Sequence, residues 1–160
     1  MLVKPSLIID DITALDLAAL KAQGIRGFIF DLDNTIVAPH AGIPEARISA
    51  WLAILQAEGF KCVVLSNNKK LDYCKQAAEV LGIPVIPEAA KPRRAAFRKA
   101  LEMINLTAKE VAMVGDRPLT DIWVGQRMGA FTILVDPLIK HSEKIYVKWL
   151  RGLERMFVRP

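Results

Sequence analysis

The chain has 160 residues, of which 52% are hydrophobic and 24% are charged. This length suits one domain, and the composition excludes a disordered chain because it provides enough apolar surface for a core. No apolar run approaches the roughly 20 residues that a membrane-spanning helix needs. The first residues, MLVKPSLIIDD, make a poor secretory signal. We therefore expect a soluble intracellular protein, located in the cytoplasm.

The net charge of the chain is +5. The excess is concentrated at the C-terminal end, where residues 138–160 hold six basic and two acidic side chains. Such an end indicates either an anionic partner or a solvated helix face. The two cysteines, Cys62 and Cys74, form neither a CxxC motif nor a cluster with histidine, which argues against a zinc site.

Helical and strand-like segments alternate along the chain. Asp10 and Asp11 can cap a first helix over 11–23. Short apolar runs predict five buried strands, over 27–31, 61–65, 84–87, 111–116 and 131–135. Periodic apolar positions, prolines and glycines predict the helices between and after them, over 44–59, 69–81, 92–104, 118–128 and 142–157.

This alternation predicts an α/β fold with three layers, in which helices cover both faces of a parallel five-stranded sheet. The whole chain, 1–160, then forms a single domain with a core over about 25–137. In such sheets, ligands bind beyond the carboxyl ends of the strands. Polar side chains at those ends are therefore the candidate site.

Seven polar residues follow successive predicted strands. They are Asp31 and Asp33 after the first, Ser66 and Asn67 after the second, Lys91 after the third, and Asp116 and Asp121 after the fourth. Several carboxylates in one crevice need a counter-charge, and oxygen ligands suit Mg²⁺. A serine, a lysine and the first turn of a helix form an anion site. A magnesium ion beside an anion site favours phosphoryl transfer.

Each of these motifs also has a simpler interpretation when it is taken alone. An acidic pair at a strand end is often solvated, SNN suits a helix cap, and a lysine before proline is usually at the surface. Their order after successive strands is what favours a common site.

The segments FDLDNT, LSNN, the isolated Lys91 and VGDRPLTD together resemble the four motifs of the haloacid dehalogenase (HAD) superfamily of phosphohydrolases, in the same order. The stretches DLDNT and GDRPLTDIWVGQRMG are most similar to the YqeG-like HAD subfamily IIIA phosphatases. That group resembles the mitochondrial phosphatidylglycerophosphatases, which remove the terminal phosphate of phosphatidylglycerophosphate. The resemblance implies a Rossmann-like HAD fold and a phosphatase activity.

The resemblance also implies the role of each residue. Asp31 would be the nucleophile that becomes an aspartyl-phosphate, and Asp33 the general acid and then the base. Lys91 would neutralise the phosphate and the nucleophile. The expected Mg²⁺ ligands are Asp31, the backbone carbonyl of Asp33, Asp116 and, in support, Asp121. The expected phosphate ligands are Ser66 and the amide of Asn67, while Thr35 would fix the loop.

Arg117 departs from the pattern of the subfamily, in which glutamine commonly follows the Gly-Asp pair. Its place beside the expected metal site makes it a candidate contact for an anionic substrate. The alternative is a surface arginine that pairs with a nearby acid.

The spacing of the motifs leaves no room for a cap domain. Asp33 and Ser66 are 33 residues apart, and Ser66 and Lys91 are 25 apart, whereas domains rarely fall below about 50 residues. An open site favours a bulky substrate, and the loop 34–42, with His40, is the only candidate lid after the first strand.

The predicted helix over 142–157 separates apolar from basic side chains. One side carries residues such as Trp149 and Leu153, and the other carries residues such as Lys148 and Arg151. Such a helix either lies in a membrane interface or packs its apolar face on the domain or on a second subunit. Membrane contact would place the protein peripherally on the inner face of the membrane.

We expect a Mg²⁺-dependent phosphohydrolase with an aspartyl-phosphate intermediate, and phosphatidylglycerophosphate at a membrane surface is the first substrate to consider. A soluble, protein or nucleic-acid-end phosphoester is the alternative substrate. A different class, a non-catalytic scaffold that binds RNA or a protein, is disfavoured because a scaffold needs no acidic cluster.

Overall fold

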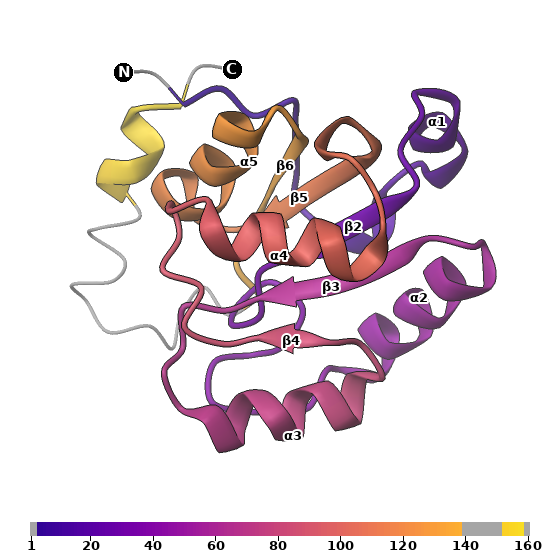
Figure 1. Cartoon of the computed structure of the whole chain (residues 1–160), viewed down its shortest axis with the longest axis vertical. Coiled ribbons are helices and arrows are strands. Elements are labelled where there is room, and N and C mark those ends of the chain that lie inside the picture. The colour runs from indigo at the N-terminus through magenta and orange to yellow at the C-terminus, as the bar shows by residue number, and fades with distance from the viewer. Residues whose placement is uncertain (1–2, 139–151, 159–160) are drawn as a thin grey trace.

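The structure is a computed structural model that describes residues 3–138 and 152–158. In these residues the centre is a parallel six-stranded sheet with the order β1-β6-β5-β2-β3-β4 (Figure 1). The strands are β1 Leu7–Ile9, β2 Gly27–Phe30, β3 Lys61–Leu65, β4 Val85–Ile86, β5 Val111–Gly115 and β6 Phe131–Val135. Strand β2, which leads to the two predicted aspartates, is therefore central.

Helices cover both faces of the sheet (Figure 1). They are α1 Leu17–Ala22, α2 Ala46–Ala57, α3 Leu71–Leu81, α4 Ala95–Ile104 and α5 Trp123–Met128. Buried side chains of α1, α2 and α3 share one core cluster with one face of the strands. Those of α4 and α5 share a second cluster with the opposite face. The two clusters confirm the predicted three layers.

The sequence GFIF explains why β2 packs against the helices on both faces of the sheet, since all four of its residues are buried. Phe28 and Phe30 point into the first core cluster, whereas Ile29 points into the second. Trp51 of α2 meets both phenylalanine rings edge-on, at centroid distances of 6.3 and 6.0 Å. Burying each of these side chains contributes roughly 1.5–3 kcal/mol. The strand that ends at the site is thus anchored from both sides.

The prediction of five strands was wrong by one. The additional strand, β1, pairs in parallel with β6 through Leu7–Ile133 and its neighbours. Its sequence, LII, is an apolar run of only three residues at the sheet edge, where it is exposed or half-buried, and a run this short does not by itself predict a strand.

Helix boundaries also differ from the predictions. The segment 11–23 divides into a 3-10 turn, Ile12–Ala14, capped by Asp11, and α1, capped by Asp16. Helix α4 begins at Ala95 rather than near Pro92, which follows Lys91 through a cis peptide bond. The segment 118–128 starts with a wider π turn, Pro118–Ile122, before α5.

The segments between the predicted motifs hold no cap domain. A loop and α2 fill the chain between β2 and β3, and α3 and β4 fill the chain up to Lys91. Most of the predicted helix 142–157 lies outside the described residues. In its described part, residues 152–156 are helical. Within the described ranges no helix is both long enough and apolar enough to span a bilayer.

Candidate active site

The structure brings the predicted site residues together at the carboxyl ends of four adjacent strands. These strands are β4, β3, β2 and β5. The chain leaves β2 at Asp31, β3 at Ser66 and β5 at Asp116, and it reaches Lys91 five residues after β4. Parallel neighbours end at the same edge of a sheet, so the motifs meet although up to 90 residues separate them.

Lys91 lies at the centre of this site. Its Nζ lies 2.7 Å from Oδ1 of Asp31 and 2.7 Å from Oδ1 of Asp121. The Lys91 and Asp121 side chains are each 1% exposed, and that of Asp31 is 13% exposed. One ammonium group therefore bridges two carboxylates in a nearly closed environment.

Lys91 and Asp121 shift each other's pKa, and Asp31 contributes to both shifts. Burial alone lowers the pKa of Lys91, but the charges of Asp121 and Asp31 outweigh that effect and raise its pKa above the ordinary value. Burial raises the pKa of Asp121, the charge of Asp31 raises it further, and the Lys91 ammonium opposes both. Lys91 is consequently held as a cation, which is the form that can bind an anion.

Three buried carboxylates could hold a metal ion. One oxygen from each of Asp31, Asp116 and Asp121 lies within 4.8 Å of the others. Thr35 joins two of them, because its Oγ1 lies 3.3 Å from Oδ2 of Asp31 and 3.3 Å from Oδ1 of Asp116. An all-oxygen set of this kind suits a hard divalent cation such as Mg²⁺.

Asp33 lies outside the group of Asp31, Asp116 and Asp121, and its side chain contacts Tyr73 of α3 and Asn68. Its Oδ1 accepts a hydrogen bond from the Tyr73 hydroxyl at 2.7 Å, and its Oδ2 lies 3.4 Å from Nδ2 of Asn68. Sequence reasoning missed Tyr73. The only signal was its position near the start of the predicted helix 69–81, five residues after the SNN segment.

The segment after β3 shapes the opposite side of the site. Ser66 is buried, and its Oγ accepts a hydrogen bond from the amide of Asn68 at 3.1 Å. The Asn67 side chain accepts from the backbone N–H of Lys91 at 2.8 Å and donates to its carbonyl at 3.2 Å. Asn67 thereby fixes the backbone of the residue that carries the central ammonium group.

Arg117 has a carboxylate partner in the described part of the chain. Its Nη2 lies 2.8 Å from Oε1 of Glu154, whose side chain is 4% exposed. Its backbone N–H donates to Oδ2 of Asp121 at 3.1 Å. The ion pair connects the segment after β5 to the helical residues 152–156, and a substrate contact by Arg117 stays a prediction. His40, in the predicted lid loop, is exposed.

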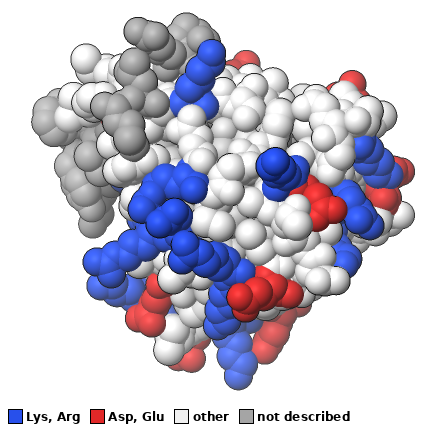
Figure 2. Space-filling model, turned by 45° about the horizontal axis from the view of Figure 1, so that its top comes forward, with Lys and Arg blue, Asp and Glu red and all other residues white. Residues whose placement is uncertain are grey.

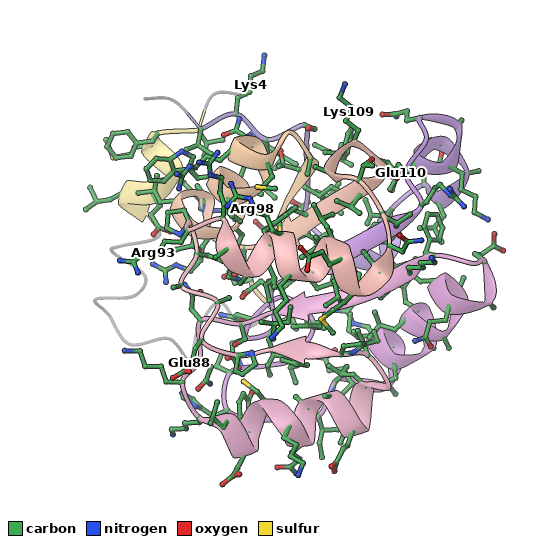
Figure 3. The ribbon with its side chains drawn as sticks, viewed as in Figure 1. Lys4, Glu88, Arg93, Arg98, Lys109 and Glu110 are labelled. Atoms are coloured by element: carbon green, nitrogen blue, oxygen red, sulfur yellow. The ribbon has the colours of Figure 1, made fainter. Side chains whose placement is uncertain are left out.

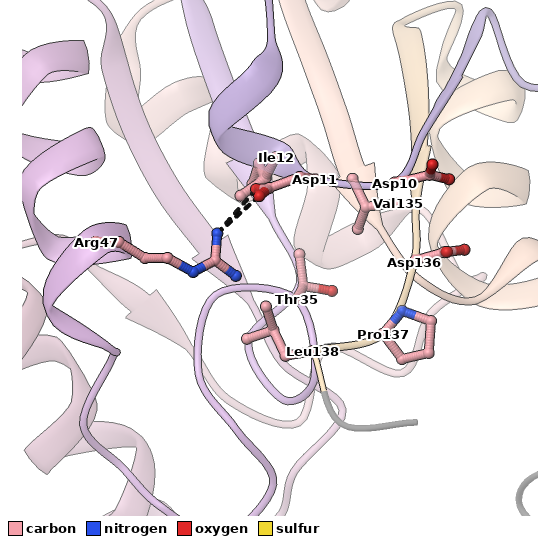
Figure 4. A pocket seen from close by; sticks show the side chains of 9 residues that line it. All are labelled: Asp10, Asp11, Ile12, Thr35, Arg47, Val135, Asp136, Pro137 and Leu138. Atoms are coloured by element: carbon pink, nitrogen blue, oxygen red, sulfur yellow. Dashed lines mark hydrogen bonds and ion pairs between the residues drawn. The ribbon is translucent and has the colours of Figure 1, made fainter. Parts of the chain in front are cut away.

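A hollow of about 180 Å³ lies beside the carboxylate cluster, between the ends of β1 and β6 and the loop after β2 (Figure 4). Thr35 lines it and also contacts the cluster. Arg47 of α2, which also lines the hollow, forms an ion pair with Asp11, in which Nη1 of Arg47 lies 3.0 Å from Oδ1 and 2.9 Å from Oδ2. This pair connects the N-terminal segment to α2.

Known structures share this fold. The cobalt-bound deoxy-D-mannose-octulosonate 8-phosphate phosphatase (YrbI) of Haemophilus influenzae superposes with a TM-score of 0.57, covering 86% of this chain and 89% of that chain at 17% identity. A structure from Streptomyces avermitilis that is assigned to the HAD family hydrolases has the same TM-score and identity, and the match covers 91% of this chain and 85% of that one. These similarities establish the HAD fold.

Sequence comparison is more specific. The protein named probable phosphatase YqeG, of Bacillus subtilis, is 35% identical over 85% of this chain and 78% of its own length. The chloroplastic phosphatidylglycerophosphate phosphatase 1 of Chlamydomonas reinhardtii is 38% identical over 96% of this chain, which spans 60% of the algal protein. The model of the mitochondrial PGP phosphatase family matches residues 1–140. The chain therefore belongs to the mitochondrial PGP phosphatase family, within the HAD fold.

Proposed function

We propose that the chain is a Mg²⁺-dependent phosphohydrolase that forms an aspartyl-phosphate on Asp31. The observation that carries the proposal is the buried cluster in which Lys91 lies 2.7 Å from both Asp31 and Asp121, with Asp116 close by. A carboxylate is repelled by a phosphate dianion. It can attack phosphorus only where fixed positive charge removes that repulsion.

The carboxylates of Asp31, Asp116 and Asp121, with the backbone carbonyl of Asp33, would hold the ion. When bound, Mg²⁺ supplies positive charge against the phosphate oxygens. Lys91 supplies a second, permanent charge beside the nucleophile. Ser66 and the backbone amide of Asn67, on the opposite side, would hold the remaining phosphate oxygens.

The proposed reaction has two steps. In the first, an oxygen of Asp31 bonds to phosphorus, the bond to the leaving oxygen breaks, and Asp33 gives that oxygen a proton. In the second, Asp33 takes a proton from a water molecule whose oxygen attacks phosphorus. The bond between phosphorus and Asp31 then breaks, which releases phosphate and restores both aspartates.

For the substrate we propose a phosphorylated lipid, with phosphatidylglycerophosphate first. The names of an algal relative, a plant relative and a yeast relative at 28% identity support this choice. The absence of a cap between the described motifs leaves the site open to a headgroup that is still attached to a bilayer. A soluble phosphoester is the alternative that the experiment below tests.

The surface next to the site also supports an anionic lipid. Arg93, Arg94 and Arg98 are exposed, directly follow the Lys91 loop, and form no ion pair with a described carboxylate. Figure 2 shows basic side chains gathered on the left of the face that it draws, and Figure 3 places Arg93 and Arg98 near the start of α4. We call these three residues the arginine cluster.

An apolar hollow adjoins the arginine cluster. Arg127 connects the two, because it lies over the Trp123 ring at 5.7 Å and donates to the carbonyl of Pro92 at 2.7 Å. Trp123 lines a hollow of about 320 Å³ with Val3, Leu119 and Phe157. Basic and apolar groups side by side suit the surface of an anionic bilayer.

The test is phosphate release by the purified chain in the presence of Mg²⁺. We expect release from phosphatidylglycerophosphate in mixed micelles to exceed release from glycerol phosphate, a phosphopeptide or a 5′-phosphorylated oligonucleotide. Chelation by EDTA and the Asp31→Asn substitution should each abolish it, whereas Asp72→Asn, at an exposed carboxylate of α3, should not. Full activity in Asp31→Asn would exclude the aspartyl-phosphate. Preference for a soluble ester would exclude the lipid.

A further inference from the structure

We propose that Tyr73 is the positioning residue of the general acid, and that its hydroxyl aims the Asp33 carboxyl group at the leaving oxygen. The inference rests on the proposed function, because it assigns a partner to the acid of that reaction. It begins from the 2.7 Å hydrogen bond that the Tyr73 hydroxyl donates to Oδ1 of Asp33.

The Asp33 side chain depends on residues from other parts of the chain for its orientation. Its backbone is held by the loop, in which the neighbouring N–H of Asn34 donates to the carbonyl of Val37 at 2.7 Å. Its carboxyl group, by contrast, is outside the trio of Asp31, Asp116 and Asp121. Among the described residues, the Asp33 side chain forms hydrogen bonds with Tyr73, by a short contact, and with Asn68, by a longer one, and both of these residues follow β3.

Tyr73 is itself fixed on two sides. It lies in the first turn of α3, and its ring packs against the first core cluster. A methyl group built on Gly42 would lie 3.3 Å from the Tyr73 ring, so the loop after β2 closely adjoins that ring. The Tyr73 hydroxyl is the donor in its 2.7 Å contact with Asp33, because an ionised carboxylate can only accept hydrogen bonds.

The chemistry needs the orientation that this contact gives. A general acid transfers its proton efficiently only when the proton-bearing oxygen is within hydrogen-bond reach of the acceptor. With Oδ1 held by the short contact from Tyr73, and Oδ2 in only a long contact with Asn68 at 3.4 Å, Oδ2 is the oxygen that would pass a proton to the leaving oxygen as its bond to phosphorus breaks. Tyr73 keeps its own proton throughout, and its hydrogen bond stabilises the carboxylate that remains.

The Tyr73→Phe variant tests this role because it removes the hydroxyl and keeps the ring. The informative quantity is kcat/KM, which reports the steps up to the departure of the leaving group. An alkyl phosphomonoester needs the proton, whereas 2,4-dinitrophenyl phosphate releases a phenolate that needs none. We expect kcat/KM to fall about tenfold for the alkyl ester, the effect of one lost hydrogen bond to a charged group, and by less than twofold for the aryl ester.

Three comparisons make the result decisive. Asp33→Asn should show the same selectivity more strongly, and Tyr73→Leu should add a loss of thermal stability that Tyr73→Phe lacks. An equal loss for both esters in Tyr73→Phe, or no loss for either, would overturn the positioning role. If the wild-type chain and Asp31→Asn were equally inactive on every ester, the proposed function itself would fail, and the role of Tyr73 would fail with it.

Discussion

Gly115, the last residue of β5, illustrates how strongly single positions constrain the site. A methyl group at this position would overlap the carboxylate and the Cβ of Asp121. The missing side chain thus makes room for the carboxylate that contacts Lys91 at 2.7 Å. Asp121 can reach the cluster only because residue 115 is a glycine.

We therefore predict that Gly115→Ala displaces Asp121 and reduces phosphatase activity about 100-fold, the usual effect of a shift of about 1 Å in a catalytic group. We also expect Mg²⁺, the proposed cofactor, to raise the melting temperature of the wild type and to raise that of Gly115→Ala much less. The matched control is Gly152→Ala, since a methyl group there meets no atom within 4 Å. A Gly115→Ala protein that kept both properties would show that Asp121 is not constrained in this way.

At the same scale, the sequence predicted the residues that the backbone alone positions. Asp31, Ser66 and Asp116 each follow a parallel strand, so the strand pattern was sufficient to place them together. The contact between Tyr73 and Asp33 was not predictable, because it depends on the angle at which α3 leaves the sheet. The Glu154 partner of Arg117 lies 37 residues away and depends on a helix that packs back on the domain.

At the scale of the elements, apolar runs in the sequence identified five strands, and the three-residue edge strand β1 was missed. Turn geometry was harder to predict than element type. The π turn Pro118–Ile122 looks like the start of an ordinary helix in the sequence. Its backbone bonds to the carbonyl of Arg117 turn Asp121 back toward the strand ends. The residue was predicted correctly as part of the cluster, but the local structure that positions it was not.

The pair of Asp11 and Arg47, drawn in Figure 4, gives a prediction about the contact between the N-terminal turn and α2. The backbone N–H of Thr13 is the main cause of the lowered pKa of Asp11, to which the Thr13 hydroxyl and Arg47 contribute. A carboxyl group whose pKa is lower in the folded state stabilises that state above its ordinary pKa of 3.8, and this stabilisation disappears as the pH falls through the lowered value.

We predict that Asp11→Asn lowers the free energy of unfolding at pH 7 by about 0.5 kcal/mol, a small value because the ion pair is exposed and screened. The asparagine keeps the capping ability of the aspartate. Urea unfolding from pH 7 down to pH 2.5 should show the difference from wild type shrinking below pH 3.8. Asp10→Asn, at an exposed carboxylate that forms no ion pair with a described residue, serves as the control for the loss of one negative charge. A difference that persisted unchanged at low pH would contradict the prediction.

At the scale of the whole molecule, the placement of charge relates the site to its surroundings. The core of the site is acidic, whereas the arginine cluster lies just beyond the Lys91 loop. Free phosphate esters need only the inner groups. A substrate in an anionic bilayer is surrounded by other anionic lipids. When the substrate enters the site, the headgroups of these lipids would lie against the arginine cluster. The cluster should therefore matter for a lipid substrate and not for a soluble one.

Replacing Arg93, Arg94 and Arg98 together by glutamine tests this distinction. Each basic residue near an anionic membrane contributes up to about 1 kcal/mol, so the triple variant should raise the apparent KM for phosphatidylglycerophosphate in anionic vesicles by about tenfold to 100-fold. Its kcat/KM for a soluble ester should stay within twofold. The control replaces three exposed lysines elsewhere, Lys61, Lys75 and Lys109, so that the net charge falls equally. Equal effects of both triple variants would show that overall charge, not the arginine cluster, brings the protein to the lipid.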